Sequence, residues 1–236
     1  MKKISTALCL SAMLIATAAE AQWQGNFLIG ASAGWGRTDG NVNFELLPPR
    51  LPETAFSTDN DNDGWLWGIL AGYQARCNEW LVGGEVSVDW TQRHDNNTVQ
   101  FTDTANRGWT ETTSFKRDAL IAFTGRIGYA VSDFFLPYAR AGIETAEDKL
   151  NFSGNANDGT VFNTNGSHRS WNFIGGLGAE MPIPVLTGLS ARLEWNYHAK
   201  GHNTTASGIA SDGTLVAAET KPSANTGKFS LVYNFI

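Results

Sequence analysis

The chain has 236 residues, of which 42% are hydrophobic, 11% aromatic and 17% charged, and its formal net charge is −6 at pH 7. No basic cluster accompanies this acidic balance, which argues against nucleic acid as a partner. Nine tryptophans, 13 phenylalanines and 25 glycines among so few charges indicate an aromatic-rich and glycine-rich β protein.

Residues 1–21 have the pattern of a secretory signal peptide. Two lysines precede the apolar stretch Leu8–Ala16, and Ala19–Ala21 has the small-x-small form of a cleavage site. The apolar stretch is shorter than the roughly 20 residues that a membrane-spanning helix needs. We therefore expect export, with residues 22–236 forming one mature domain. That domain keeps a single cysteine, Cys77, so no internal disulfide can hold it together.

Eight segments of the mature chain alternate apolar or aromatic residues with small or polar ones. In chain order they are 25–38, 64–76, 80–93, 115–130, 134–147, 169–181, 188–199 and Phe229–Ile236. The third is typical, with Val82, Val86 and Val88 on one face and Glu85 and Asp89 on the other. Strands with one apolar and one polar face suit a sheet that has lipid outside and a polar interior.

The charged residues follow the same division. The expected outer faces hold one charge, Arg117, because a lysine or arginine facing lipid at mid-bilayer costs about 2–4 kcal/mol. We expect the inward charges to form a network of ion pairs that fills a narrow lumen and leaves no large pore. Its members are Glu85, Asp89, Asp118, Arg126, Arg140, Glu144, Glu180, Arg192 and Glu194.

Aromatic residues near the ends of the outer faces predict two membrane-interface girdles. Trp80 and Trp90 are ten residues apart, which projects to about 24 Å along the axis of a tilted strand, close to the height of a lipid-facing band. The predicted girdle residues are Trp35, Trp65, Trp80, Trp90, Tyr129, Trp171, Trp195 and Tyr233.

The connections between the segments alternate in length. Those at 77–79, 131–133 and 182–187 are short, whereas those at 39–63, 94–114, 148–168 and 200–225 are long and rich in Asn, Asp, Thr and Gly. This pattern predicts an all-β fold, a transmembrane eight-stranded antiparallel up-and-down β-barrel. Both ends would be periplasmic, and four mobile loops would lie outside the cell.

Several short sequences resemble the eight-stranded outer-membrane β-barrel family of small surface antigens. They include the segments 126–129, 136–142, 175–180, 192–197 and Tyr233-Asn234-Phe235. That group includes the porin-family β-barrel domain and, more distantly, the opacity proteins and OmpA-type barrels. The resemblance covers the whole mature chain and implies an architecture, but it says little about activity.

The first long connection is unusually apolar for an exposed segment. We interpret its large side chains as a loop patch that packs over the barrel mouth or contacts a partner; they are Phe44, Leu46, Leu47, Leu51 and Phe56. Residues 59–64 resemble the start of a calcium loop, but Leu70 stands where the twelfth residue should be an acid. All four histidines fall near the outer strand ends without a metal-ligand spacing, so we expect no metal and no cofactor.

These patterns favour a monomer with structural and surface-interaction roles in the outer membrane of a Gram-negative bacterium. Expected partners are the lipid and lipopolysaccharide of that membrane, the barrel-assembly machinery during insertion, and a host surface ligand. A narrow channel for ions or small solutes is the first alternative. A lipid-modifying enzyme is the second, although Tyr197-His198-Ala199-Lys200 lacks a serine two residues after the histidine.

Overall fold

The computed structural model describes residues 23–47, 54–59, 62–91, 95–103, 106–200 and 204–235, which form fourteen β-strands. The expected signal peptide and Leu51 lie outside this described part, as does the side chain of Phe56. Among the described residues, no helix has the length and apolar character needed to cross a membrane.

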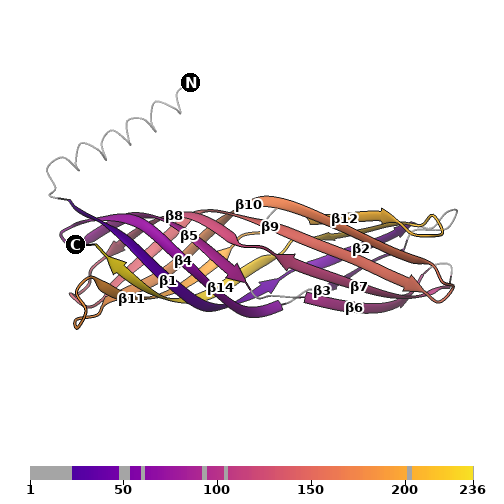
Figure 1. The fold of residues 1–236 in the computed structure, drawn as a ribbon, viewed down its shortest axis with the longest axis horizontal. Helices are drawn as coiled ribbons and strands as arrows, with labels where there is room; N and C mark the ends of the chain where they lie inside the picture. The colour runs from indigo at the N-terminus through magenta and orange to yellow at the C-terminus, as the bar shows by residue number, and fades with distance from the viewer. Residues whose placement is uncertain are drawn as a thin grey trace, which may run out of the picture.

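Eight strands form a closed antiparallel ring, which is called the barrel below (Figure 1). In order around the ring they are β1 (Gln24–Asp39), β4 (Asn62–Cys77), β5 (Trp80–Thr91), β8 (Leu120–Tyr129), β9 (Leu136–Ala156), β10 (Val161–Pro182), β11 (Leu189–His198) and β14 (Ser223–Asn234). The last strand pairs with the first, from Leu28↔Asn234 to Asp39↔Ser223, and so closes the ring. A closed ladder leaves no edge to expose to lipid. The predicted eight-stranded fold is confirmed.

The barrel has an apolar outer surface and a polar interior. Phe123, Ile127 and Leu177 are exposed on the outside, whereas Arg126 and Glu180 are buried inside. Adjacent side chains on a strand point to opposite faces, so the alternation seen in the sequence separates the two environments.

The long connections, expected to be four mobile loops, contain further strands that were not predicted from the sequence. These strands are β2 (Asn41–Leu47), β3 (Thr54–Asp59), β6 (Asp95–Thr102), β7 (Gly108–Arg117), β12 (Thr204–Ile209) and β13 (Leu215–Thr220). Together with residues 147–156 of β9 and 161–170 of β10 they form the distal extension, which continues the barrel along its long axis (Figure 1). β6, β7, β9 and β10 pair in one sheet, and β12, β13, β2 and β3 form a second.

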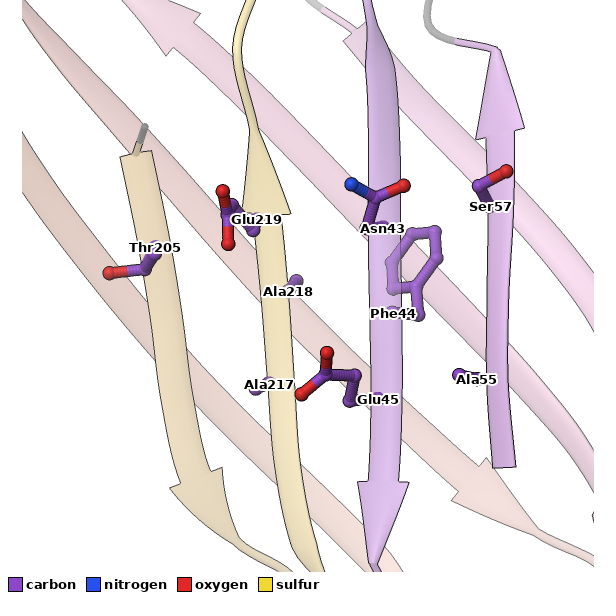
Figure 2. A pocket seen from close by; sticks show the side chains of 9 residues that line it. All are labelled: Asn43, Phe44, Glu45, Ala55, Ser57, Thr205, Ala217, Ala218 and Glu219. Atoms are coloured by element: carbon purple, nitrogen blue, oxygen red, sulfur yellow. The ribbon is translucent and has the colours of Figure 1, made fainter. Parts of the chain in front are cut away.

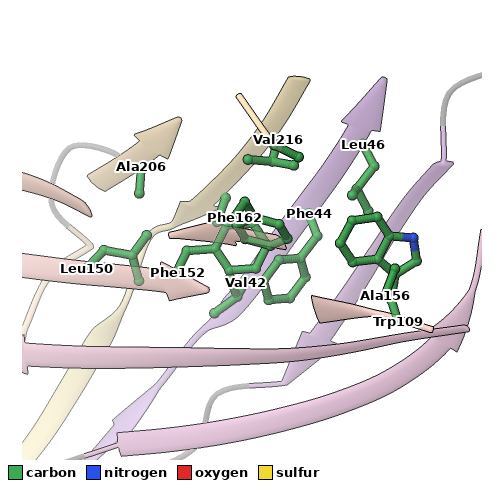
Figure 3. Packing of buried hydrophobic residues seen from close by; sticks show 12 residues of the cluster. Val42, Phe44, Leu46, Trp109, Leu150, Phe152, Ala156, Phe162, Ala206 and Val216 are labelled. Atoms are coloured by element: carbon green, nitrogen blue, oxygen red, sulfur yellow. The ribbon is translucent and has the colours of Figure 1, made fainter. Parts of the chain in front are cut away.

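The distal extension reverses the polarity of the barrel. Its outer faces carry polar residues such as Asn151 and Asn163, and its interior is a continuous apolar cluster (Figure 3). This cluster consists of Val42, Phe44, Leu46, Trp109, Leu150, Phe152, Ala156, Phe162, Ala206, Ala210, Val216 and Ala218. Such an arrangement is normal for a β structure in water, where apolar burial drives folding.

A bulge separates the barrel from the distal extension on one side and corrects two sequence interpretations. Arg117 pairs with Asp148 and Ile121 with Thr145, so the three residues 118–120 face only the two residues 146–147 of β9. The expected single strand 115–130 is therefore divided between β7 and β8. An extra residue inverts the alternation beyond it.

Arg117 and Asp118, where this bulge begins, take the opposite faces from those predicted. Arg117, expected to face lipid, points inward with its side chain 9% exposed and binds Asp148 with an Nε–Oδ1 distance of 2.6 Å. Asp118, expected in the lumen, lies on the outside with its Oδ2 2.7 Å from Nζ of Lys149. Asp118 is thus not part of the interior charge network.

Candidate functional site

Ion pairs cross the barrel interior between strands that are not neighbours. Arg192 on β11 lies on the opposite side of the ring from Glu85 on β5, and the distance from its Nη1 to Oε1 of Glu85 is 2.7 Å. Nε of Arg192 is also 3.0 Å from Oε2 of Glu180. Arg126 binds the same two carboxylates, at 2.9 Å to Glu180 and 3.2 Å to Glu85. The four side chains form one buried cluster in which each charge has two partners.

Two more buried pairs extend this cluster along the interior. Arg140 donates to both carboxylate oxygens of Glu194, at 3.0 and 3.1 Å, and the Tyr138 hydroxyl donates to Glu194 at 2.7 Å. Lys228 on β14 donates to both oxygens of Asp89 on β5 at 2.8 Å. Buried charges persist in proteins only with such partners, because an isolated one loses its hydration without compensation.

The structure brings together eight of the nine lumen residues named from the sequence and leaves out Asp118. Sequence reasoning missed Lys228, because the terminal strand was placed from Phe229 onward. In the structure β14 begins at Ser223, and Lys228 falls on its inward face. The alternation of Ala224, Thr226, Lys228 and Ser230 is the signal that could have found it.

His198 is the last residue of β11, near an outer strand end as expected, and its side chain is buried inside the barrel. Its Nδ1 is 2.7 Å from Oε2 of Glu144, and its Nε2 is 3.0 Å from the Thr226 hydroxyl. A carboxylate, an imidazole and a hydroxyl in this order are the groups that acyl-transfer triads use. All three are buried, so as it stands the arrangement orients the ring between β9 and β14.

Several polar atoms on β9, β10 and β11 are buried in the interior with no hydrogen-bond partner among the described residues. They include Glu144 Oε1, Thr145 Oγ1, Ser170 Oγ, Asn172 Oδ1 and both amide atoms of Asn196. Buried polar groups are otherwise almost always hydrogen-bonded, to protein or to ordered water. We therefore expect this level of the interior to be hydrated, in contrast to the apolar cluster on its distal side.

The distal interior also contains the carboxyl group of Glu111, in addition to the Asp148 carboxyl that binds Arg117. Glu111 on β7 is 1% exposed, and neither carboxyl oxygen has a hydrogen-bond partner among the described residues. It faces Gly154 on β9, where an added Cβ would approach the Glu111 Cγ and the Phe162 ring. Desolvation raises the pKa of Glu111 to about 8.

The turns at the distal tip are joined by a charged cluster. Arg107 binds Asp103 at 2.8 Å and also binds Asp212 on the β12–β13 turn, while Asp158 on the β9–β10 turn lies 3.7 Å away. Trp109 Nε1 donates to Asp103 at 2.9 Å. Burial alone would raise the pKa of Asp103, but the hydrogen bonds from Trp109 and Arg107 outweigh it and hold that pKa below its ordinary value.

The expected loop patch is not a surface patch where the structure describes it. Phe44 and Leu46 are buried in the distal cluster, because β2 turns its alternate residues inward, and only Leu47 is exposed. Phe44 packs against Phe152 with their ring centroids 5.1 Å apart (Figure 3). Two of the five residues are therefore unavailable to a partner.

The aromatic residues named as girdles lie on the outer surface of the barrel, with Trp90 half-buried and the others exposed. Trp80 meets Tyr129, and Trp35 meets Trp65, each pair with ring centroids 5.1 Å apart. Trp90 stacks on Trp67 at 4.4 Å. These rings lie on the same outer faces as the exposed apolar residues of the barrel, and their role as membrane-interface girdles stays a prediction.

No group of three His, Cys, Asp or Glu side chains in the described part of the chain is arranged to hold a metal ion. The calcium-loop segment 59–64 and two of the histidines, His94 and His202, lie wholly or partly outside that part. His168 lies on β10 and does not join His198 in a ligand cluster.

Comparisons with known proteins agree with this architecture. A sequence model of the outer membrane protein beta-barrel domain matches residues 5–235. No curated protein sequence matches the chain. Similar solved structures include Ail, the attachment invasion locus protein of Yersinia pestis, which is 12% identical with a TM-score of 0.41 over 88% of this chain and 98% of that chain. OprG from Pseudomonas aeruginosa is 12% identical, with a TM-score of 0.49 over 90% of this chain and 98% of that chain. The outer membrane protease OmpT from Escherichia coli is 7% identical, with a TM-score of 0.48 over 88% of this chain and 97% of that chain.

Proposed function

The chain belongs to the outer membrane protein β-barrel domain family, and from this premise we propose that it is a non-conducting envelope protein that binds surface ligands. The barrel lies in the outer membrane, with its short turns in the periplasm and the distal extension outside the cell. Its roles are to contribute to envelope structure and to hold a rigid protein surface beyond the lipid.

A closed interior is supported by two different obstructions in series. In the barrel, the Arg192–Glu85 pair and its neighbours cross the ring from side to side. In the distal extension, Phe44, Phe152 and Phe162 meet within the apolar cluster. An ion would have to displace paired charges and then enter an apolar region, and both steps are unfavourable.

The observation that carries the surface role is the apolar cluster of the distal extension. Connections that served only to link strands would be short or irregular, and long loops are mobile by default. Here the connections fold into paired strands around a shared interior, so the outer faces of β2, β13 and β10 keep fixed positions. A fixed surface lowers the entropic cost of binding a partner.

Attachment of bacteria that carry the protein tests this role. The variant Phe152→Asp places a charge in the distal cluster, whereas Asn151→Asp places the same charge on the adjacent outward position. We expect cells with the first variant to lose binding to host matrix coatings and cells with the second to keep it. Both barrels should still migrate as folded species on unheated gels. Equal attachment by the two variants would contradict the proposal.

A narrow channel is the second candidate, and the unpartnered polar atoms around Asn172 and Asn196 favour it by indicating a hydrated level in the barrel. Planar bilayers containing the refolded protein distinguish the two. We expect no conductance above that of the lipid bilayer. Discrete conductance steps would contradict the closed-barrel proposal and indicate a channel.

The Glu144–His198–Thr226 arrangement is the observation that would favour a lipid-modifying enzyme. Its burial weakens this reading, because an acyl chain would need to reach the Thr226 hydroxyl inside the barrel. Mass spectra of lipid A from expressing cells give the test. We expect spectra unchanged by expression, and a new acyl pattern that Thr226→Val abolishes would establish the enzyme instead.

A further inference from the structure

The outward-facing residues of the four-stranded sheet β12-β13-β2-β3 form three rows across the strands. Strand pairing aligns them, and their composition changes toward the distal tip. The row nearest the barrel is Thr205, Glu219, Asn43 and Ser57; the middle row is Ser207, Ala217, Glu45 and Ala55; the distal row is Ile209, Leu215 and Leu47.

The first two rows enclose a shallow hollow of about 420 Å³ (Figure 2). Its floor is low because Ala217 and Ala55, which flank Glu45 across the strands, have short side chains. Glu45 and Glu219 both line this hollow. Diagonal cross-strand neighbours lie about 7–8 Å apart, so the two carboxylates act on the same bound group.

The distal row is apolar and exposed. Ile209 is 68% exposed and Leu215 is 52% exposed, and with Leu47 they line a second hollow of about 370 Å³ that shares Ala217 with the first. Outward residues of the distal extension that lie nearer the barrel, such as Asn151 and Asn163, are polar, so this row is not continuous with the lipid-facing band, although Val161 is also exposed near the tip. An apolar row on a water-exposed sheet costs solubility unless it is covered by a partner.

We propose that this sheet face binds an extended peptide segment of another protein that alternates basic and aliphatic side chains. The inference rests on the surface-binding role proposed above and specifies the chemistry of the ligand. Alternate side chains of an extended segment point to opposite sides, so the segment lies with its edge on the sheet, between the middle and distal rows. Its basic groups then lie against Glu45 and Glu219, and its aliphatic side chains cover Ile209, Leu215 and Leu47.

Charge complementarity is the reason for proposing a peptide with basic side chains on this sheet face. Within the described residues no ion pair involves Glu45, and the chain as a whole carries a formal net charge of −6. Two carboxylates in one hollow repel the phosphates of lipids and the acidic groups of glycans, but they attract lysine and arginine. The adjoining apolar row selects a peptide over a purely polar polycation.

Fluorescence anisotropy with the full-length barrel in zwitterionic nanodiscs tests the proposal. The probes are labelled seven-residue peptides of alternating lysine and leucine, of alternating glutamate and leucine, and of alternating lysine and serine. Protein-free nanodiscs report binding to lipid alone. We expect saturable binding of the lysine–leucine peptide above that background, weaker binding of the lysine–serine peptide, and none of the acidic peptide.

Matched variants locate the binding site. Glu45→Gln should weaken binding about three-fold, as loss of an exposed ion pair does, and Ile209→Ser about ten-fold, as loss of a covered aliphatic side chain does. The controls Glu79→Gln and Val131→Ser remove the same groups from exposed positions at the opposite end of the barrel, and they should change binding less than two-fold.

The outcomes separate this inference from the proposed function. If the lysine–leucine peptide does not bind above background, or binds Glu45→Gln and Ile209→Ser as tightly as it binds the parent chain, the inference about the sheet face is overturned. In that case cells that still attach through an intact distal extension leave the surface role standing. Loss of binding in the Glu79→Gln control alone would also overturn it, because the peptide would then occupy the other end.

Discussion

Arg192 on β11 binds Glu85 across the full width of the barrel, with 2.7 Å between Nη1 and Oε1. The two residues are 107 positions apart in the chain and four strands apart around the ring. This pair couples opposite walls, so it resists flattening of the barrel.

Replacing Arg192 by alanine should lower the free energy of unfolding by about 3–5 kcal/mol, because Glu85 and Glu180 then keep buried charges with fewer partners. Urea unfolding in detergent micelles measures the change. Arg169→Ala is the control, since the Arg169 side chain is exposed and 3.9 Å from Glu147. Its effect should stay below about 1 kcal/mol. Similar losses in the two variants would contradict the structural role of the cross-barrel pair.

The stability of the distal extension should depend on pH through Glu111. The pKa of its carboxyl in the folded chain is about 8, above its ordinary value of 4.5, so the folded state retains the proton over a range in which the unfolded state has lost it. Stability from this group is fully present below pH 4.5 and is lost as pH rises through 8, by on the order of 5 kcal/mol in total.

Glu111→Leu should remove this pH dependence and stabilise the extension at neutral pH. Unfolding followed by circular dichroism between pH 4 and pH 9 compares the variant with the parent chain. The exposed residue Glu45 supplies a control, because Glu45→Leu leaves the Glu111 carboxyl in place and should retain the pH dependence of stability seen in the parent chain. If the stability of Glu111→Leu still fell with rising pH as in the parent chain, another group would be responsible for the pH dependence.

Two glycines of the barrel should respond differently to the same substitution. A Cβ on Gly142 would lie 2.0 Å from the Phe123 carbonyl oxygen and 2.7 Å from the Thr124 Cα, whereas a Cβ on Gly84 would meet nothing within 4 Å. We expect Gly142→Ala to destabilise the folded barrel by about 1–3 kcal/mol, since the clash is with backbone. Gly84→Ala should be close to neutral, and the folded fraction on unheated gels measures both.

The boundary between lipid and water can be mapped with arginine. Phe123→Arg places a charge on the exposed apolar band of the barrel, while Asn151→Arg places it on the outer face of the distal extension. The first should cost about 2–4 kcal/mol in unfolding from lipid vesicles. The second should change stability by less than about 0.5 kcal/mol. Equal costs at the two positions would place the distal outer face in lipid.

Much of the barrel can be predicted from the sequence because its strands obey a strict alternation. Glu85, Arg126 and Glu180 are each next in sequence to an outward-facing residue, Val86, Ile127 and Ala179, so the two-residue alternation places them inside. The same alternation fails at one extra residue. The bulge at 118–120 exchanges the faces of Arg117 and Asp118, and nothing local in the sequence marks it.

The distal strands were missed for a different reason. Asn41–Leu47 alternates as clearly as any barrel strand, but its flanks are rich in Asn, Asp and Pro, which favour turns. Its partner β13 is far away in the chain, with Val42 pairing with Thr220. A short strand gains stability only from such a partner and from a shared apolar interior, so its own residues do not reveal it.

The sequence by itself determined which side chains of each barrel strand face lipid and which face inward, because a two-residue period depends only on local backbone geometry. Only the tertiary structure decided that Arg192 meets Glu85, that His198 lies between Glu144 and Thr226, and that the distal connections enclose an apolar core. These contacts depend on how the ring closes and on the register between strands distant in the chain, and both are set by packing of the whole molecule.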